Sequence, residues 1–395
     1  MRNVVIVSAV RTPFGNFGGV LRDFTSAELG GIALKEVLKR INLDPKLVEE
    51  VCLGINLPGS DRSIARQAAL KAGIPDEIPA ISLDRACCSS MTAIGIESQN
   101  IQLGQINIAA VGGSENMSQV PYFIHAARWG QRIGDITLND QLVIKCPYSG
   151  VPRALQAGKE SVEFGITRED QDKWAFRSQQ LCAKAQSEGK FKDELLTISI
   201  PQRKGDPLLV DKDEPPRADT TLEKLAKLPT VNQSPTVTAG NAPGLNTGAS
   251  AVILMSEEKA KEMKLPILAT LVSHARFAGH PQRIASIPAY TAQIALKRAN
   301  LKIDDIKLLE INEAFAAMPL VSSKILGDSD PAKVEKIREK LNVNGGAVAI
   351  GHPTGATGAR LVMTLAYELK RRGGGYGLAS ICGGIGEGEA CVIRV

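Results

Sequence analysis

Three segments of the sequence combine a reactive side chain with small neighbours, at points where a predicted strand ends. In residues 83–93, LDRACCSSMTA, Cys87 stands between a short strand and an apolar stretch with helical spacing. A thiol at the start of a helix faces the positive end of the helix dipole, which favours the thiolate. Cys87 is therefore a candidate nucleophile, whereas Cys88 is better explained as a small buried apolar side chain.

The second segment, residues 344–358, is the glycine-dense turn NGGAVAIGHPTGATG, which carries His352. Glycines let the backbone approach a ligand closely, and an imidazole at such a turn can accept a proton from a thiol or stabilise an oxyanion. No Lys-Ser or Lys-Thr pair follows, as a phosphate loop for nucleoside triphosphates requires. The segment is consistent with a general base, although glycine-rich turns are also typical of purely structural positions.

Two further segments complete the set. Residues 380–388, SICGGIGEG, place Cys382 beside glycines whose N–H groups can face a developing negative charge, and this thiol can move a proton. Residues 312–315, NEAF, follow the predicted strand 307–311, at the end where α/β folds place functional side chains. Each segment alone is better explained by a structural role than by a functional one, so the functional interpretation depends on their combination.

The elements that position these segments alternate in a βαβ rhythm. Apolar periodicity predicts strands over residues 3–9, 50–55 and 249–255, and helices over residues 25–40, 60–72 and 168–187. Thr25 and Glu28 have the spacing of a capping box at the first of these helices. Residues 80–113 and 341–384 both follow the order strand, turn, helix, strand, which indicates a duplicated α/β half.

We therefore predict three parts along the chain. Residues 1–119 with 245–266 form an N-terminal half that carries the nucleophile. Residues 120–244, where Trp, Tyr, Pro and charged residues interleave, form a loop-rich insertion. Residues 267–395 form a C-terminal half that carries the histidine and the second cysteine. A chain of 395 residues is long enough for such a multi-part core.

Composition excludes several classes of function. The balance of 47 basic and 42 acidic residues, with 4% aromatic residues, favours an anionic small molecule over a nucleic acid as partner. No run of eighteen apolar residues and no basic leader occurs, so we expect no membrane span, no export and a cytoplasmic location. Seven cysteines without C-x-x-C spacing and four scattered histidines predict reduced thiols and no metal site.

Together the four segments resemble those of the thiolase family, enzymes that cleave or form 3-oxoacyl-coenzyme A. The resemblance runs nearly end to end, since it includes VSAVRTPFG at residues 7–15, GGSENMS at 112–118 and TVTAGN at 236–241. It implies an α/β fold, the thiolase fold, with two duplicated βαβαβαββ halves in five layers, α-β-α-β-α. It also implies that the insertion is a loop domain that covers coenzyme A.

The resemblance assigns a role to each candidate residue. Cys87 matches the nucleophile that carries the acyl group as a thioester. His352 would activate it and, with a water held by Asn312, form one oxyanion hole. Cys382 matches the acid and base that moves a proton at the α-carbon or the coenzyme thiol. The N–H groups of Cys87 and Gly384 would form the second oxyanion hole.

The same resemblance bears on ligands and partners. Arg217, in the segment RADTT, resembles a coenzyme-contacting arginine, and Ala242 and Gly244 are the other expected coenzyme contacts. Coenzyme A would enter as a substrate, with no permanently bound cofactor. Thiolases form homodimers or homotetramers, and some act with a small zinc-ribbon and OB-fold partner protein.

Departures from the family pattern concern the substrate. Asp84 stands where asparagine is usual, Ser90 where glycine follows the nucleophile, and Pro243 where a serine often contacts the coenzyme. Residues 148–155, YSGVPRAL, replace the usual His-Met segment of the covering loop, so we expect an acyl pocket unlike that of an acetoacetyl-CoA thiolase.

The covering loop suggests an acyl group with a carboxylate or an aryl group, as in benzoylsuccinyl-CoA or 3-oxoadipyl-CoA. Three arginines near the loop, Arg128, Arg132 and Arg153, are candidates to meet a carboxylate. The alternative is that they are solvated side chains that coat the surface.

Two other functions were weighed against a thiolase. Condensing enzymes of the ketoacyl synthase or hydroxymethylglutaryl-CoA synthase type share the fold, but they use other triads, and Cys382 in a C-x-G-x-G run favours a thiolase. A non-catalytic acyl-binding or lipid-binding scaffold would have lost a catalytic residue, and all are present. The direction of the reaction, thiolysis or condensation, stays open because both use the same residues.

Overall fold

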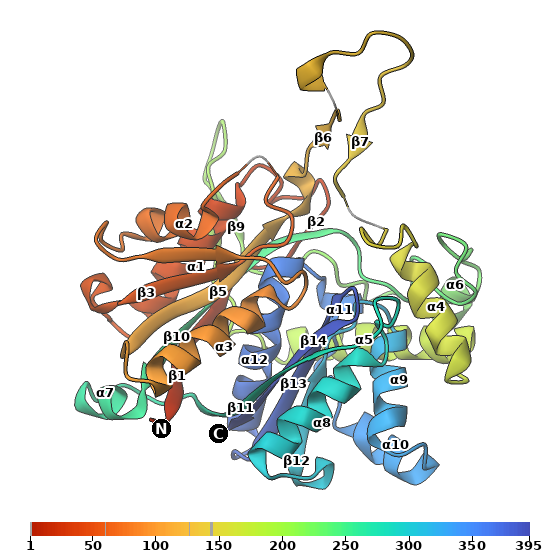
Figure 1. Cartoon of the computed structure of the whole chain (residues 1–395). Helices are drawn as coiled ribbons and strands as arrows, with labels where there is room; N and C mark the ends of the chain where they lie inside the picture. Colours follow the sequence, from red (N-terminus) through yellow and green to blue (C-terminus); the bar gives the residue numbers. More distant parts are fainter. Residues whose placement is uncertain (1, 60, 126, 143–144) are drawn as a thin grey trace.

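The structure is a computed structural model, and it describes residues 2–59, 61–125, 127–142 and 145–395 (Figure 1). The N-terminal half contains, in chain order, β1 (Val4–Arg11), β2 (Gly15–Asn16), α1 (Ser26–Lys39), β3 (Glu50–Gly54), α2 (Ile64–Ala72), β4 (Ala80–Leu83), α3 (Ser89–Gln102), β5 (Ile108–Asn116), β10 (Asn246–Ser256) and α7 (Glu257–Glu262).

The C-terminal half contains β11 (Ala269–Ala278), α8 (Ile287–Ala299), β12 (Ile306–Ile311), α9 (Ala317–Leu326), α10 (Pro331–Glu339), α11 (Ala347–Ile350), α12 (Thr354–Arg371), β13 (Tyr376–Gly384) and β14 (Glu387–Arg394). The insertion contains β6 (Tyr122–Phe123), β7 (Asn139–Asp140), α4 (Arg153–Glu163), α5 (Arg168–Ser187), β8 (Ile198–Ile200), β9 (Leu208–Val210) and α6 (Leu222–Ala226).

The strand order shows the duplication. One half has the order β4-β3-β5-β10-β1 and the other β12-β13-β14-β11, with parallel strands at the outer side and antiparallel strands toward the junction. The halves join where β1 pairs with β11, over Val4–Ile6 and 269–271. The strand predicted to begin at residue 341 is not formed, because Leu341 makes only an isolated bridge to Leu309.

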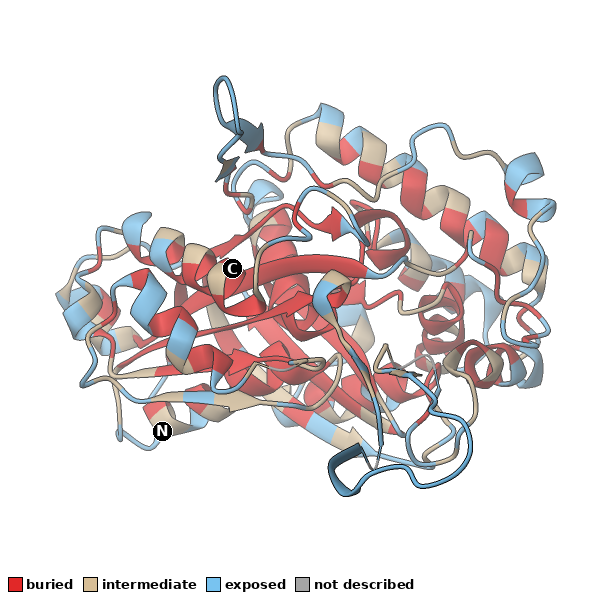
Figure 2. Ribbon diagram, turned by 90° about the horizontal axis from the view of Figure 1, so that it is seen from above, coloured by how far each residue is buried: buried red, intermediate tan, exposed pale blue. Residues whose placement is uncertain are grey.

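The helices form layers around the strands (Figure 1). Helices α1 and α2 contact the strands of the first half, and α8 contacts the strands of the second, with α9 packed against α8. Helices α3 and α12 pack against each other, and α12 also contacts β5 and β10 of one half and β12 and β13 of the other. Buried residues accordingly gather in the strands and helices at the centre of the molecule (Figure 2). This is the predicted thiolase arrangement.

Local sequence signals explain where several elements begin. The capping box predicted for Thr25 and Glu28 is present at α1, and Thr167 with Asp170 forms another at α5. The helix predicted from residue 60 begins at Ile64. The glycine-dense segment before His352 was predicted as a turn, but it contains the short helix α11.

The insertion contains more helix than was predicted from its sequence. The helix over residues 168–187 was predicted and is α5, but α4 was not predicted. The face that α4 buries combines Ala154 and Ala157 with the polar side chains of Gln156, Glu160 and Ser161. The hairpin β6–β7 projects from the body of the molecule (Figure 1). No helix in the described ranges is long and apolar enough to cross a membrane.

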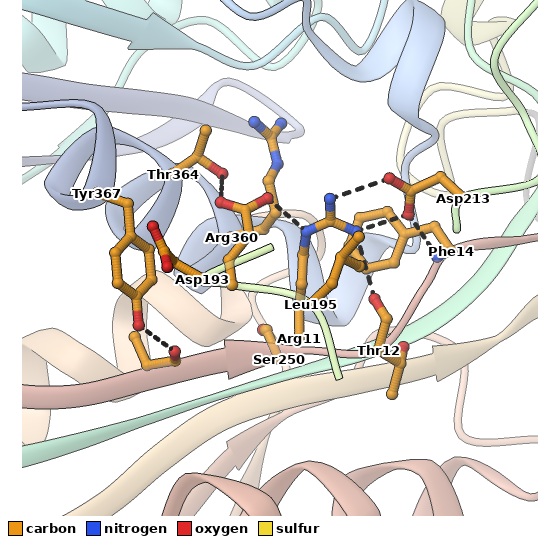
Figure 3. Close-up of polar contacts among 12 residues, drawn as sticks. Arg11, Thr12, Phe14, Asp193, Leu195, Asp213, Ser250, Arg360, Thr364 and Tyr367 are labelled. Carbon is orange, nitrogen blue, oxygen red and sulfur yellow. Dashed lines mark hydrogen bonds and ion pairs between the residues drawn. The ribbon is translucent and has the colours of Figure 1, made fainter. Parts of the chain in front are cut away.

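A buried ion cluster attaches the insertion to the core (Figure 3). The Arg11 side chain, at the end of β1, is fully buried; its Nε donates to Glu194 at 2.7 Å, and its Nη1 and Nη2 donate to Asp213 at 2.6 and 3.0 Å. Glu194 also accepts a hydrogen bond from Thr364 of α12, at 2.9 Å. The cluster therefore ties the chain at Asp213 to β1, and the chain at Glu194 to both β1 and α12.

Candidate active site

Cys87 lies in a tight turn between β4 and α3. The preceding residue, Ala86, has a φ of +45°, a backbone conformation that is unfavourable for a residue with a side chain. The Ala86 N–H donates to Asp84 Oδ1 at 2.7 Å, and its carbonyl accepts from Ser89 Oγ at 2.7 Å. These bonds hold the strained turn and with it the position of the thiol. Asp84 thus provides an acceptor that an asparagine would provide equally.

A second set of contacts ties the Cys87 turn to the C-terminal half. The fully buried carboxylate of Glu389, on β14, accepts from Arg85 and Thr92 at 2.7 and 2.8 Å, and His274 Nε2 lies 3.2 Å from it. Ser90, the other departure near the nucleophile, accepts from the backbone of α12 at 2.9 Å. The nucleophile turn is therefore positioned by elements from both halves.

His352 faces Cys87 from the start of α12. Its Nε2 lies 3.2 Å from Cys87 Sγ, and its Nδ1 lies 2.8 Å from Thr357 Oγ1. Thr357 donates its only hydroxyl hydrogen to the carbonyl of Pro353, at 2.8 Å, so its oxygen must accept from Nδ1–H. The lone pair of Nε2 consequently faces the thiol. The backbone N–H of His352 donates to Asn246 Oδ1 at 2.8 Å, which fixes the ring from a second side.

Burial keeps this pair uncharged. Burial and the positive charge of Arg360 lower the pKa of His352 to about 3. Burial, assisted by the neighbouring Cys382, raises the pKa of Cys87 well above its usual value. The sequence predicted that the start of α3 favours the thiolate, but a helix end contributes only about 0.3–1 kcal/mol, less than one pKa unit. Both shifts favour the uncharged forms, a thiol on the half-buried Cys87 and a neutral imidazole on His352.

Asn312 follows β12 and completes the surroundings of the imidazole. Its backbone N–H donates to the carbonyl of Ser380 at 3.0 Å, and its Nδ2 lies 3.3 Å from His352 Nε2. Its Oδ1 is buried and has no hydrogen-bond partner within the described ranges. Asn312 thus presents an unused acceptor beside the catalytic pair.

Cys382 and Gly384 lie at the end of β13. Cys382 is buried, and burial raises its pKa to about 11, although the Gly384 N–H and the charge of Arg153 act in the opposite direction. Gly384 has a φ of +68°, and a Cβ there would stand 2.9 Å from Arg153 Nη2. The backbone conformation therefore favours glycine at this position, and a Cβ there would displace the flexible end of the Arg153 side chain.

The five predicted catalytic residues come from four places in the fold. Cys87 precedes α3, His352 precedes α12, Asn312 follows β12, and Cys382 and Gly384 end β13. The arrangement pairs a thiol with a neutral base, adds a second thiol that stays protonated at neutral pH, and places a glycine N–H beside it. Such a set can transfer an acyl group through a thioester.

Of the three predicted coenzyme contacts, Arg217 and Gly244 are exposed and Ala242 is half-buried. The side chain of Arg217 is exposed, and its backbone N–H donates to Gln179 Oε1 at 2.7 Å. The nearby Pro215 packs on Gly351, beside the histidine, because a Cβ at Gly351 would stand 3.0 Å from Pro215 Cγ. Ala242 is half-buried, and a Cβ at Gly244 would have no neighbour within 4 Å, so Gly244 is open to a ligand.

Three residues that position the site were not identified from the sequence. Thr357, Asn246 and Glu389 orient the imidazole and the nucleophile turn. Thr357 lies within the histidine motif and its spacing offered a signal, but Asn246 and Glu389 meet the site only through the tertiary fold. The described residues contain no cluster of three or more His, Cys, Asp or Glu side chains that could hold a metal ion.

Comparisons with protein families and with curated proteins both match nearly the whole chain. The family models described as "Thiolase, N-terminal domain" and "Thiolase, C-terminal domain" match residues 4–258 and 265–395. An acetyl-CoA acetyltransferase of Syntrophomonas wolfei is 42% identical, over 100% of this chain and 99% of that protein. A beta-ketoadipyl-CoA thiolase of Acinetobacter baylyi is 40% identical over 100% of both.

Solved structures are similar throughout. The crystal structure of the Bacillus anthracis acetyl-CoA acetyltransferase superposes with a TM-score of 0.95 at 42% identity, over 100% of this chain and 99% of that one. The human mitochondrial 3-ketoacyl-CoA thiolase in complex with CoA superposes with a TM-score of 0.93 at 38% identity, over 100% and 98%.

Proposed function

The chain belongs to the thiolase family of acyltransferases, and from this membership we propose that it cleaves a 3-oxoacyl-CoA with coenzyme A, reversibly, through an acyl thioester on Cys87. The observation that carries the proposal is the 3.2 Å contact between Cys87 Sγ and the unprotonated Nε2 of His352. The condensing-enzyme and scaffold alternatives are not favoured, because Cys382 completes the thiolase set.

In the first half-reaction, Cys87 Sγ attacks the 3-oxo carbonyl and its proton moves to His352 Nε2. The bond between the α- and β-carbons then breaks. The acyl group that contains the former 3-oxo carbon stays on Cys87, and the departing CoA thioester, formed as an enolate, takes a proton from Cys382. A neutral starting pair suits this step, because charge separation occurs only as the transition state forms. The pKa of Cys382, raised to about 11, keeps that thiol protonated until the enolate appears.

In the second half-reaction, coenzyme A enters as the acyl acceptor. Its thiol gives its proton to the Cys382 thiolate and attacks the thioester, and Cys87 leaves as a thiolate that recovers the proton from His352. All protons are thereby returned. The N–H groups of Cys87 and Gly384 would stabilise the thioester oxyanion, and protonated His352 with a water on Asn312 Oδ1 would stabilise the enolate.

Coenzyme binding is proposed for the exposed surface beside the histidine. Arg217 is suited to the phosphates of the coenzyme, because a solvent-accessible guanidinium forms paired hydrogen bonds with phosphate oxygens. Ala242 and Gly244 would contact the rest of the coenzyme, which approaches Gly244 freely. We further propose a cytoplasmic homodimer or homotetramer, with a small zinc-ribbon and OB-fold protein as a conceivable partner.

The substrate is proposed to differ from acetoacetyl-CoA. The covering segment at residues 148–155 departs from the pattern of acetoacetyl-CoA thiolases, and this segment leads into α4, whose first residue lies on Gly384. A carboxylated or aryl acyl group, as in 3-oxoadipyl-CoA or benzoylsuccinyl-CoA, is the proposed class. Among the relatives, a protein named beta-ketoadipyl-CoA thiolase is 40% identical and acetyl-CoA acetyltransferases are 42% identical, so identity alone does not choose between the two substrate classes.

Intact-protein mass spectrometry after brief exposure to a panel of acyl-CoA and 3-oxoacyl-CoA thioesters tests the proposal. Wild type should gain the mass of one acyl group, and Cys87→Ala should gain none. Cys88→Ala is a matched control, because it removes the adjacent buried thiol and should still be acylated. An adduct of equal yield in Cys87→Ala, or none in wild type with every thioester, would refute the assignment.

A further inference from the structure

One cation, Arg153, lies against the catalytic centre. Its Nη2, Cζ and Nη1 would be 2.9, 3.0 and 3.2 Å from a Cβ on Gly384, so the flat face of the guanidinium rests on this glycine. The charge of Arg153 lowers the pKa of both Cys87 and Cys382, against the larger effect of burial. Both the packing and the electrostatic coupling place the guanidinium beside the reacting atoms.

This charge has no counter-charge among the described residues. Arg153 forms no ion pair there, and its only hydrogen bond runs from Nη1 to Gln156 Oε1, at 3.3 Å. Gln156 is 3% exposed, and its Nε2 is a buried donor without a partner. Arg153 is also the first residue of α4, where the positive end of the helix dipole disfavours a cation by about 0.3–1 kcal/mol. The unpaired charge of Arg153, the unpaired amide donor of Gln156 and the start of α4 therefore lie together.

Two buried carboxylates whose charges act on the catalytic thiols, Glu160 on Cys382 and Glu115 on Cys87, each already accept several hydrogen bonds. Glu160, further along α4, accepts hydrogen bonds from the backbone of Ile284, Ala285 and Ser286. Glu115, whose charge acts on Cys87, accepts from four donors, which belong to Asn56, Leu57, Thr354 and Gly355. Neither carboxylate forms an ion pair with Arg153 in the described residues, so the half-buried guanidinium keeps donors free for a carboxylate of the substrate.

The other two arginines considered for the acyl group are placed differently. Arg128 and Arg132 are exposed and lie between β6 and β7, on the hairpin that projects from the body (Figure 1). Solvent satisfies their charge, as expected for surface arginines. The structure therefore separates one arginine at the catalytic centre from two at the surface.

We propose that Arg153, with the free amide donor of Gln156, binds a second carboxylate carried by the acyl part of the substrate and so selects dicarboxylic 3-oxoacyl-CoA thioesters. The inference rests on the proposed thiolase function and names its substrate class. A carboxylate accepts paired hydrogen bonds from a guanidinium, and the half-buried site excludes enough water to make this pairing selective. A neutral acyl group would leave the guanidinium unpaired.

The experiment compares each dicarboxylic substrate with its own neutral ester. The two pairs are 3-oxoadipyl-CoA with its terminal methyl ester, and 2-carboxymethyl-3-oxobutanoyl-CoA with its methyl ester, which place the carboxylate on the chain end or on an α-branch. The kcat/KM for CoA-dependent cleavage is measured in the full-length enzyme by chromatography of the product thioesters. The readout is the ratio of acid to ester, which cancels general damage to the site.

Wild type should favour the acid over the ester by about tenfold or more in at least one pair, the range expected for hydrogen bonds to a charged group. Arg153→Gln should bring this ratio close to one, and Arg153→Lys should restore part of it. Arg128→Gln, a matched loss of charge on the hairpin, should keep the wild-type ratio.

Two outcomes would overturn the inference and are distinguishable. If wild type cleaves acid and ester equally in both pairs, or if Arg153→Gln slows both by the same factor, Arg153 does not select a carboxylate and the thiolase function stands. If no thioester of the panel acylates Cys87 in wild type, the proposed function fails and the inference fails with it.

Discussion

Replacing Thr357 by valine would test how the protein sets the hydrogen positions on His352. Thr357 Oγ1 accepts the Nδ1–H of His352 at 2.8 Å, because its own hydrogen is used on Pro353. The valine side chain has nearly the same shape as threonine, but it cannot accept a hydrogen bond. In the variant, the tautomer that presents a lone pair to Cys87 leaves its Nδ1–H buried without a partner, so the opposite tautomer becomes favoured.

The size of the effect follows from this unpaired donor. A buried N–H that loses its acceptor costs about 1–3 kcal/mol, and each 1.4 kcal/mol changes an equilibrium about tenfold. The fraction of enzyme with a competent base should therefore fall by roughly 5- to 150-fold. The protonated imidazole formed after proton transfer loses the same bond, so the transition state gains no compensation.

Two rates should fall together in Thr357→Val. One is kcat/KM for CoA-dependent cleavage of the 3-oxoacyl-CoA that acylates Cys87 fastest, and the other is the alkylation of Cys87 by iodoacetamide at a fixed pH. Thr357→Ser keeps the hydroxyl and should retain both rates within a few-fold, with circular dichroism confirming an intact fold. Rates for the valine variant within threefold of wild type would refute the tautomer reasoning.

Three further predictions concern stability and the glycine turn. Arg11→Met leaves Asp213 and a second carboxylate buried without their cation, so the urea midpoint should fall by the equivalent of about 3–5 kcal/mol; an unchanged midpoint would contradict this. Gly384→Ala imposes a φ of +68° on alanine and displaces Arg153, so cleavage should slow at least about tenfold by the same chromatographic assay, and full activity would show that the N–H is dispensable. Because the pKa of His352 is lowered to about 3, only the unfolded chain binds this proton below about pH 6.5. Stability should therefore drop by up to about 1.4 kcal/mol per pH unit on acidification, and His352→Gln should lose that contribution in urea melts at pH 5 and 7; equal slopes would count against it.

Most of the fold was predictable because local signals and tertiary packing agree. Apolar periodicity located β1, α1, α5 and β10, and the capping box of Thr25 and Glu28 marked the start of α1. The prediction failed at α4, which was not identified, and at Leu341, which forms one isolated bridge where a strand was expected. Apolar periodicity indicates which face of a segment is buried, but it does not show whether a neighbouring strand pairs with that segment.

The candidate site was predictable in its residue types but less so in its charge states. The motifs placed Cys87 and His352 correctly at the starts of two helices. They did not indicate that burial outweighs the helix end and keeps the thiol protonated, because desolvation depends on every element around the site. Nor did they separate Arg153 from the exposed arginines, since only the packing of α4 on Gly384 does so.

The division of the catalytic pair between the duplicated halves has a consequence for biosynthesis. Cys87 belongs to the first half and is translated early, whereas His352 and Cys382 arrive with the last helix and the last strands of the second. A nascent chain that has folded only its first half therefore displays a lone thiol with no base to activate it. The complete catalytic set is therefore present only when nearly the whole chain has been synthesised.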